Sequence, residues 1–464
     1  MYNFKIYNSM ENKKVLFEPI DVNNIKVYAC GPTVYDFAHI GNARMAVVFD
    51  TLIRILRHLY PRVTYVSNIT DIDDKIIEKS RLEKLPIKDV TNKFSKIYNE
   101  DMEMLNVIKP NYQPKATEYV DKMIRAIKEL ENKGCAYYAS NHVMFDITKY
   151  PNYGSLSSRM HHEQLAGSRV EVANYKRNSG DFVLWKPSKG DEPFWDSPWG
   201  KGRPGWHTEC FVMATNILGT PFDIHGGGLD LKFPHHDNEL AQSCCFSGNV
   251  DNNKSYAKYW MHNGFVTVNS EKMSKSLKNI KLVKDYLKLY DGEVIRLALM
   301  SAHYRSPLNW SEKVLSQSRN ILNKYYKVID ELKDIKINKN IKSNSIIKKI
   351  EAALLDDLNI SKAFSELDAQ IKNISNKNSQ EKKIIKEAIL FISNVLGIFL
   401  KKNKDKKIIG DNILNENDIE LLVNKRNKAR KNKNFELADE IRKKLYDMGI
   451  EIKDDEKGTQ WKKI

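Results

Sequence analysis

Apolar runs and chain breaks in the first 70 residues predict a strand, a helix and a second strand. Residues 25–29 form a short apolar run that ends at Cys30. Apolar residues then recur at helical spacing from about residue 42 to 59, Pro61 ends this helix, and residues 63–69 follow as the next strand. This order predicts a βαβ unit and therefore a parallel, nucleotide-binding sheet. No GxGxxG follows the first strand, which argues against a dinucleotide-dependent dehydrogenase.

The pattern changes twice further along the chain. Residues 115–206 lose the periodicity and are rich in Gly, Pro, Trp and Ser, which is typical of an insertion into the sheet. Past Pro307 helical spacing returns, residues 401–407 resemble a lysine-rich linker, and residues 435–448 predict a last helix stopped by Gly449. The apolar positions at helical spacing are Leu315, Leu322, Tyr325, Ile329, Leu332, Leu354, Leu358, Leu367, Ile385, Ile389, Ile392 and Leu396.

These changes predict an α/β protein: a Rossmann-like parallel-sheet domain with an insertion, then an α-helical domain and a small C-terminal domain. A length of 464 residues fits two to four domains. The predicted parts are residues 1–114 with 207–306 for the sheet domain, 115–206 for the insertion, 307–400 for the helical domain and 408–464 for the C-terminal domain.

The amino-acid composition indicates which binding partners and which cellular compartment to expect. Lysine plus arginine outnumber aspartate plus glutamate by 75 to 59, and a net charge of +16 favours a polyanionic partner such as nucleic acid. The alternative is lysine spread over solvated helix faces. Five cysteines make a poor disulfide framework, and no apolar run reaches the roughly 18 residues of a membrane span. The N-terminus lacks the apolar core of a signal peptide, so we expect a cytoplasmic protein with reduced cysteines.

Two short motifs carry candidate phosphate chemistry. HIGN, residues 39–42, lies between the first strand and its helix, where free backbone N–H groups suit phosphates. Gly41 allows close backbone approach and His39 can donate to a phosphate oxygen. KMSKS, residues 272–276, places Lys272 and Lys275 three residues apart, where both ammonium groups can stabilise charge on departing pyrophosphate. Each motif alone fits a solvated turn or a basic run. The two together, in this order and in a chain that predicts a parallel sheet, form a specific combination.

Together the motifs resemble the class I aminoacyl-tRNA synthetases, and longer segments resemble the cysteinyl-tRNA synthetase family. The resemblance covers nearly the whole chain and is most specific between residues 28 and 279. The segments that carry it are YACGPTVYDFAHIGNAR (28–44), NITDIDDKII (68–77), GRPGWHTEC (202–210), FDIHGGGLDLKFPHHDNELAQS (222–243), KMSKSLKN (272–279) and ADEIRKKLYDMGIEIKDDEKGTQW (438–461).

A metal centre follows from residues and resemblance together. Pro234 is placed to open a helix, on which His235 and Glu239 would share one face. A zinc site with mixed sulfur, nitrogen and oxygen ligands is chemically ordinary, although helical His and Glu are also common on surfaces. The resemblance implies one Zn²⁺ per chain. Its ligands would be Cys30, Cys210, His235 and Glu239, with the neighbouring His236 and Cys244 left out.

A metal ion would help the enzyme to distinguish cysteine from serine. Cysteine and serine differ by one atom, and shape alone discriminates such pairs by only about 1–3 kcal/mol. Zinc binds a thiolate at about 2.3 Å and lowers a thiol's pKa, whereas a serine hydroxyl ionises poorly. Direct contact with the substrate sulfur would make a separate editing site unnecessary.

The resemblance also implies roles for other residues. Thr70 and Trp206 match positions lining the cysteine pocket, with a core aromatic as the alternative for Trp206. Gly228 and Asp230 match the stretch that receives adenosine, with Asp230 facing the ribose hydroxyls. His39, Gly41, Asn42, Lys272 and Lys275 match the ATP-binding set. Asn42 departs from the usual final histidine, so it can donate a hydrogen bond but carries no charge.

We therefore predict a ligase that joins L-cysteine to tRNA(Cys) through a cysteinyl-adenylate, with ATP and Mg²⁺ as substrate and no side-chain nucleophile. His39, Asn42, Lys272 and Lys275 would be the catalytic groups. The resemblance assigns residues 307–400 to tRNA binding and 408–464 to the anticodon, and we expect a monomer with no membrane partner. The alternatives are a zinc-dependent cysteine:amino-sugar ligase, a noncatalytic tRNA-binding paralogue and a purely structural zinc protein.

One candidate tRNA contact lies at the chain end. Trp461 precedes Lys462 and Lys463, so an exposed indole within a cationic patch would stack on an unpaired anticodon base. The alternative is that Trp461 folds back onto the last helix as a small hydrophobic plug.

Overall fold

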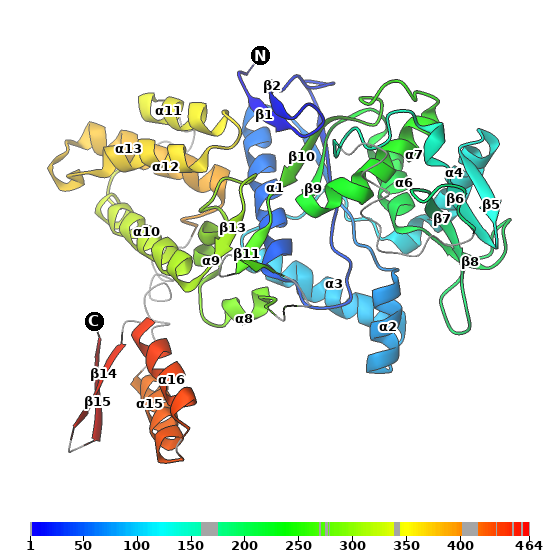
Figure 1. The fold of residues 1–464 in the computed structure, drawn as a ribbon. Helices are drawn as coiled ribbons and strands as arrows, with labels where there is room; N and C mark the ends of the chain where they lie inside the picture. Colours follow the sequence, from blue (N-terminus) through cyan, green and yellow to red (C-terminus); the bar gives the residue numbers. More distant parts are fainter. Residues whose placement is uncertain are drawn as a thin grey trace.

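The computed structural model describes residues 2–158, 175–268, 271–273, 277, 279–337, 344–400, 416–432, 434–447, 450–455 and 458–463. None of the helices within these ranges is long and apolar enough to cross a membrane. The chain starts beside the β1–β2 hairpin (Lys5–Asn8 and Lys13–Leu16) and ends in the hairpin of the C-terminal unit, as Figure 1 shows.

A four-stranded parallel sheet forms the centre of the N-terminal part of the chain. Its strands are β3 (Ile25–Ala29), β4 (Val63–Ser67), β9 (Phe222–Gly228) and β10 (Ala257–Asn263), in the order β10-β9-β3-β4. Each neighbouring pair is parallel. Helix α1 (Ile40–Leu59) connects β3 to β4, so the predicted βαβ unit and parallel sheet are confirmed.

Both faces of this sheet are buried, as expected for parallel strands. Along β3, Val27 and Ala29 pack into one hydrophobic cluster with residues of α1, whereas Tyr28 packs into a second cluster. The second cluster includes residues of α6 (Trp206–Leu218) and α7 (Asp237–Ser247). Figure 1 shows α1 behind the strands and α6 and α7 beside them.

The segment between β4 and β9 has a fold of its own rather than an irregular one. It contains α4 and an antiparallel sheet of order β5-β6-β7-β8. The elements between β4 and α6 are α2 (Asp74–Glu83), α3 (Ile87–Met104), η1 (Ala116–Tyr119), α4 (Val120–Asn132), β5 (Ala136–Ala139), β6 (His142–Phe145), η2 (Ile147–Lys149), β7 (Phe182–Pro187) and β8 (Gly202–Pro204).

After β10 a small three-stranded sheet of order β12-β11-β13 leads into the helical part. The elements that follow β10 here are β11 (Val266–Val268), β12 (Glu271–Lys272), α8 (Val283–Leu287), α9 (Gly292–Leu299) and β13 (Leu308–Trp310), whereas η3 (Leu229–Leu231) and η4 (Lys232–His236) lie between β9 and α7. The helical part contains α10 (Glu312–Glu331), α11 (Ser345–Leu354), α12 (Ile360–Ile371), η5 (Ile374–Asn376) and α13 (Ser379–Leu396).

The helical spacing of Leu354, Leu358 and Leu367 does not lie on one continuous helix. Helix α11 ends at Leu354, and the chain turns through Asp357 and Leu358, whose φ angles are 61° and 59°. Helix α12 begins only at Ile360. Leu354, Leu358 and Leu367 are all buried in the same cluster, because the turn between the helices keeps Leu358 facing the core.

The C-terminal unit consists of α15 (Glu416–Lys431), α16 (Phe435–Asp447) and a hairpin of β14 (Ile450–Asp455) and β15 (Gly458–Lys463). The predicted last helix is therefore confirmed from Phe435 to Asp447, while its predicted stop at Gly449 lies outside the described residues. The unit has a small core of its own, formed by Ile419, Val423, Ile441, Leu445, Ile450 and Ile452.

Candidate active site and metal centre

Several of the predicted site residues lie at the carboxyl edge of the parallel sheet, where open α/β sheets bind their ligands. Cys30 follows β3, Asn68 follows β4 and Gly228 ends β9. The loops after β3 and β4 cross so closely that a Cβ on Gly31 would lie 1.6 Å from the Asn68 carbonyl oxygen. Glycine at this position therefore lets the Asn68 side chain reach the site.

Four predicted ligands form one buried cluster. Candidate ligand atoms of Cys30, Cys210, His235 and Glu239 all lie within 4.8 Å of one another. The His235 Nε2 atom is 3.1 Å from Glu239 Oε1, and the Cys30 Sγ atom is 3.6 Å from the same oxygen. Two sulfurs, one imidazole nitrogen and one carboxylate oxygen form a donor set suited to zinc.

The local structure around His235 agrees with the predicted helix start. Phe233 has extended dihedral angles (φ −139°, ψ 133°) and is the only non-helical residue of η4, so the helical backbone resumes at Pro234. His235 lies in this helical turn, η4. This turn runs directly into α7 through His236, which has helical angles of φ −71° and ψ −33°. His235 and Glu239 therefore remain one turn apart and still meet.

Residues outside the predicted set orient the cluster. The second oxygen of Glu239, Oε2, lies 2.9 Å from His225 Nε2 and accepts a 2.9 Å hydrogen bond from the Tyr256 hydroxyl. On the other side, His207 Nδ1 lies 2.9 Å from His235 Nδ1. Such outer contacts fix the orientation and tautomer of metal ligands. The sequence prediction missed all three, although His207 and His225 lie within GRPGWHTEC and FDIHGGG, two of the segments that carry the resemblance.

A second grouping shares two members with the first. Cys30 and Glu239 also lie within 4.8 Å of His225 and His236, and His236 Nε2 is 3.4 Å from Cys30 Sγ. The sequence prediction set His236 aside, yet the structure places it against Cys30. Glu239 Oε2, on the His225 side, also accepts a hydrogen bond from the Tyr256 hydroxyl, whereas Oε1 lies near both His235 and Cys30. The oxygen without the competing hydroxyl therefore faces the set with Cys210 and His235.

The charges of the cluster are arranged to hold a cation. Burial opposes ionisation of Glu239, but His225 and His235 outweigh it and hold the pKa of this carboxyl well below its usual range. Burial likewise opposes a charged His235, yet the Glu239 carboxylate raises the pKa of its imidazole to about 10. A hydrogen bond from the Cys30 thiol lowers the pKa of Cys210 to about 6. A buried carboxylate beside a readily ionised thiol favours a bound positive charge at this point.

Thr70 and Trp206 lie beside the cluster. The Asn68 side-chain amide donates to Thr70 Oγ1 at 3.3 Å, and its carbonyl oxygen accepts a weak 3.7 Å contact from the Cys210 thiol. Trp206 stacks on His235 with ring centroids 4.1 Å apart. With 37% of its surface exposed, Trp206 is not a core aromatic. Both side chains thus adjoin the donor cluster, Thr70 through Asn68 and Trp206 through His235.

The HIGN segment caps α1. Nδ1 of His39 accepts a hydrogen bond from the Asn42 backbone N–H (3.2 Å), and Oδ1 of Asn42 accepts one from the His39 N–H (3.1 Å). This reciprocal capping box starts α1 at Ile40, two residues before the predicted start. Because Nδ1 is an acceptor, the proton of a neutral His39 resides on Nε2. A Cβ on Gly41 would lie 3.0 Å from the His39 ring, a tight contact that glycine avoids.

The chain just after the KMSKS motif lies against HIGN. The Ile40 N–H donates to the Lys281 carbonyl at 2.9 Å, and the Val283 N–H donates to the Ala38 carbonyl at 2.9 Å. Met273 approaches Gly41 closely, since a Cβ there would lie 3.5 Å from its Cε. Lys275 and the Lys272 side chain lie outside the described residues. The backbone nevertheless brings the two motifs to the same place.

Gly228 and Asp230 follow β9 at the same sheet edge. Gly228 precedes the helical turn η3, and a Cβ on it would lie 2.5 Å from Asp230 Oδ1. Glycine therefore allows the Asp230 carboxylate to fold back over the end of the strand.

Arg44, just after HIGN, is a buried cation that sequence patterns did not identify. Its guanidinium donates to the carbonyls of Gly264 and Phe265 at 2.8 Å each. It also donates to the carbonyls of His303 (3.2 Å) and Ser306 (2.6 Å). Burial lowers the pKa of Arg44 to about 10. These bonds tie α1 to the chain entering β11, the strand that leads to KMSKS.

Replacing Arg44 by lysine tests this tie. Lysine has three donors and no planar fork, so Arg44→Lys leaves at least one buried carbonyl unpaired. We expect the free energy of unfolding in urea to fall by about 1–3 kcal/mol. The exposed Arg57 on the same helix provides the matched control Arg57→Lys. Equal stability of the two variants would refute the assigned role.

Trp461 lies in β15, where it pairs with Ile452 of β14. Its partly buried ring packs against the small core of the C-terminal unit. The structure thus places Trp461 in the arrangement that the alternative interpretation requires, a hydrophobic contact within its own unit.

Comparison with known proteins adds a second line of evidence. Residues 16–320 match the family model of the class I (C) tRNA synthetase catalytic domain. Residues 416–461 match the model of the cysteinyl-tRNA ligase anticodon binding domain. The chain is 45% identical over 469 residues to a cysteine–tRNA ligase of Maricaulis maris (strain MCS10), with 100% of both chains covered. It is 47% identical over 466 residues to one from Ehrlichia ruminantium (strain Welgevonden), with 98% of each covered.

Among solved structures, the fold is similar to that of Mycobacterium tuberculosis methionyl-tRNA synthetase in complex with methionyl-adenylate. The TM-score is 0.58 with 11% sequence identity, over 81% of this chain and 92% of that one. At this identity the similarity concerns the fold alone.

Proposed function

The chain belongs to the cysteinyl-tRNA synthetase family, a class I aminoacyl-tRNA ligase family, and from this premise we propose how its own residues carry out the reaction. The carboxylate of L-cysteine attacks the α-phosphorus of ATP, the bond to the β-phosphate oxygen breaks, and pyrophosphate leaves. The 3′-terminal ribose hydroxyl of tRNA(Cys) then attacks the cysteinyl carbonyl of the adenylate, and AMP leaves. The buried donor cluster at the sheet edge is the observation that carries this proposal.

Cys30, Cys210, His235 and Glu239 would hold one Zn²⁺, because their donor atoms converge and their charges favour a cation. When bound, zinc supplies a soft ligand site for the substrate thiolate, which a serine hydroxyl fills poorly. Thr70 and Trp206 would line the remainder of the cysteine pocket.

The ATP side of the site lies at the N-terminus of α1. His39, with its Nδ1 occupied by the helix cap, would donate from Nε2 to a phosphate oxygen. Gly41 and Asn42 would let the backbone approach the phosphates, and Gly228 and Asp230 would receive the adenosine. ATP would bind together with Mg²⁺. Lys272 and Lys275 would stabilise the negative charge that grows on the leaving pyrophosphate.

The direct test is charging of purified tRNA with radiolabelled cysteine, with serine as a control substrate and an amino sugar as a control acceptor. We expect cysteinyl-tRNA only, together with cysteine-dependent ATP–pyrophosphate exchange. Ligation of cysteine to the amino sugar would contradict the proposal. The match of residues 416–461 to an anticodon binding domain favours tRNA as the acceptor.

A conservative change next to the cluster tests the metal assignment. Tyr256→Phe removes one of the two contacts to Glu239 Oε2 and leaves the packing of the ring intact. Loss of such an outer contact weakens metal affinity by about 10- to 100-fold. We expect a loss of zinc affinity near 10-fold, because His225 still contacts Glu239 Oε2. Competition with a fluorescent zinc chelator measures the affinity. Wild-type zinc affinity in Tyr256→Phe would argue against Glu239 as a ligand.

A further inference from the structure

Two cysteines outside the donor cluster lie together where the insertion packs against α7. Cys135 directly precedes β5 and Cys245 lies in the last turn of α7, and both are buried, with 7% and 2% of their surfaces exposed. Helix α4, which leads to Cys135, packs against α7 (Figure 1), and the Lys133 ammonium group donates to the Phe246 carbonyl. This contact ties the turn before Cys135 to the residue after Cys245.

Backbone hydrogen bonds connect the two cysteines from the other side. The Asp146 N–H donates to the Cys135 carbonyl at 2.9 Å, and the Lys149 N–H donates to the Asp146 carbonyl at 3.1 Å. The Lys149 carbonyl oxygen in turn lies 3.7 Å from Cys245 Sγ. The fold thus holds both side chains at one point between the insertion and α7, where a hydrogen bond links the two thiols.

The two thiols of this pair differ in their readiness to ionise. The hydrogen bond from Cys245 lowers the pKa of the Cys135 thiol against the opposing effect of burial, and the positive charges of Lys133 and Lys149 act in the same direction. The same hydrogen bond, together with burial, raises the pKa of the Cys245 thiol. A readily ionised thiol beside a protonated partner is typical of redox-sensitive cysteines, in which one sulfur reacts with the oxidant and the other resolves the product.

We propose that Cys135 and Cys245 form a peroxide-sensitive thiol pair whose disulfide displaces α7 and slows the activation of cysteine. The Cys135 thiolate attacks hydrogen peroxide, the O–O bond breaks, and a sulfenic acid and hydroxide result. The Cys245 sulfur then attacks the sulfenic sulfur, its proton leaves with the hydroxyl group as water, and the S–S bond forms. The two sulfurs lose the two electrons that the peroxide gains, and a dithiol such as dithiothreitol reverses the change.

The consequence for catalysis follows from the place of Cys245 in α7. A disulfide holds its sulfurs about 2.05 Å apart, closer than a thiol hydrogen bond does, so the end of α7 and the start of β5 must approach each other. A close-packed interior transmits such a shift. Glu239 lies six residues before Cys245 in the same helix, and a displacement of about 1 Å can cost an active site about 100-fold in rate. This consequence rests on the proposed function, whereas formation of the disulfide does not.

Peptide mapping of the full-length protein with zinc added detects the disulfide directly. After treatment with hydrogen peroxide and blocking of free thiols, tryptic digestion should yield residues 134–149 cross-linked to residues 233–254. The second peptide also contains Cys244, so the map is repeated with Cys244→Ser to assign the bond to Cys245. Absence of the cross-link in the wild type, or its loss in Cys244→Ser, would overturn the proposal.

Cysteine-dependent ATP–pyrophosphate exchange measures the effect on activity. Peroxide should lower kcat/KM for cysteine of the wild type by about 10- to 100-fold, and dithiothreitol should restore it. Cys135→Ser and Cys245→Ala each lack one half of the pair and should keep their activity under the same treatment, whereas Cys244→Ser should respond like the wild type. An equal loss of activity in Cys135→Ser and Cys245→Ala would assign the oxidation to other thiols and contradict the role of the pair.

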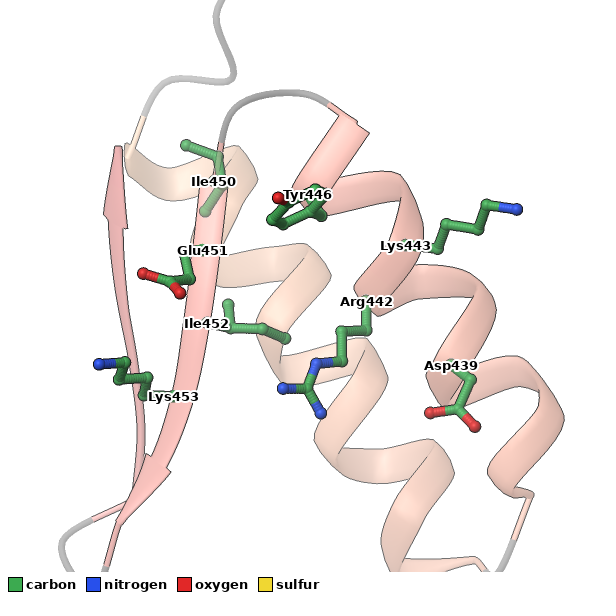
Figure 2. A pocket seen from close by; sticks show the side chains of 8 residues that line it. All are labelled: Asp439, Arg442, Lys443, Tyr446, Ile450, Glu451, Ile452 and Lys453. Atoms are coloured by element: carbon green, nitrogen blue, oxygen red, sulfur yellow. The ribbon is translucent and has the colours of Figure 1, made fainter. Parts of the chain in front are cut away.

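The C-terminal unit provides an internal control. Its residues 416–463 contain no cysteine, and the groove between α16 and β14 has none among the side chains drawn in Figure 2. Oxidation should therefore leave the affinity of the full-length protein for a tRNA anticodon stem-loop unchanged. Unaltered exchange activity of the cross-linked protein would refute the switch, as would loss of stem-loop binding, which indicates general unfolding. If the reduced wild type exchanged no pyrophosphate, the proposed function would fail, while the peptide map would still test the disulfide.

Discussion

Cys210→Ser is expected to abolish stoichiometric zinc binding and to weaken cysteine affinity by at least about 100-fold. Loss of an outer contact costs a metal site about 10- to 100-fold, and loss of a ligand removes more. A hydroxyl is a harder ligand than a thiolate and does not ionise near neutral pH, whereas the pKa of the Cys210 thiol is lowered to about 6 by the hydrogen bond from Cys30. Elemental analysis gives the zinc content, and pyrophosphate exchange gives the KM for cysteine.

Cys244→Ser is the matched control. Cys244 is also fully buried, but it lies outside the donor cluster, 3.4 Å from the Ser255 hydroxyl. It should keep one zinc per chain and wild-type cysteine affinity. If Cys210→Ser kept its zinc, or bound cysteine as tightly as the wild type, the assignment of the metal centre would be wrong.

The folding pattern of the sheet domain could be predicted because its signals are local. The apolar run of β3 and the proline after α1 mark element ends without any knowledge of the tertiary structure. The start of α1 was placed two residues late, since a histidine cap is not a usual helix signal. The break between Leu354 and Ile360 was also missed, because its apolar residues keep helical spacing across the turn.

Only part of the metal centre could be predicted from local sequence patterns. His235 and Glu239 are four residues apart, so their pairing could be expected from spacing alone. Cys30 follows β3 and Cys210 lies in α6, so the two cysteines are brought together only by the packing of this helix against the sheet. Without the family resemblance, the choice of these two among five cysteines had no basis in the sequence.

The supporting residues could not be predicted for a different reason. Arg44 binds four backbone carbonyls that are 220 to 262 residues away, and carbonyls leave no pattern in a sequence. Trp461 depends on hairpin register, because its pairing with Ile452 turns the indole toward the small core. A lysine-flanked tryptophan has the same sequence in either register, so only the structure shows that Trp461 packs against the small core.

Lys275→Ala is expected to lower the turnover of ATP–pyrophosphate exchange by about 10²- to 10³-fold and to change the KM for cysteine little. The ammonium group would meet negative charge that grows on pyrophosphate as it departs, so its contribution arises in the transition state rather than in substrate binding. The backbone just after the motif is hydrogen-bonded to the HIGN segment at Ile40 and Ala38, and Met273 within the motif approaches Gly41, which holds the loop near the phosphate end of the site.

A control variant must separate the position of Lys275 from the simple loss of one positive charge. Lys288→Ala removes an equal charge from an exposed lysine just past α8 that pairs with Asp285, so it should leave exchange unchanged. Zinc content should be normal in both variants, because the donor cluster contains no lysine. Chemically supplied cysteinyl-adenylate should restore charging of tRNA by Lys275→Ala, since transfer to the ribose hydroxyl releases AMP and no pyrophosphate. A variant that lost cysteine affinity but kept its exchange turnover would show that Lys275 acts in binding and not on the leaving group.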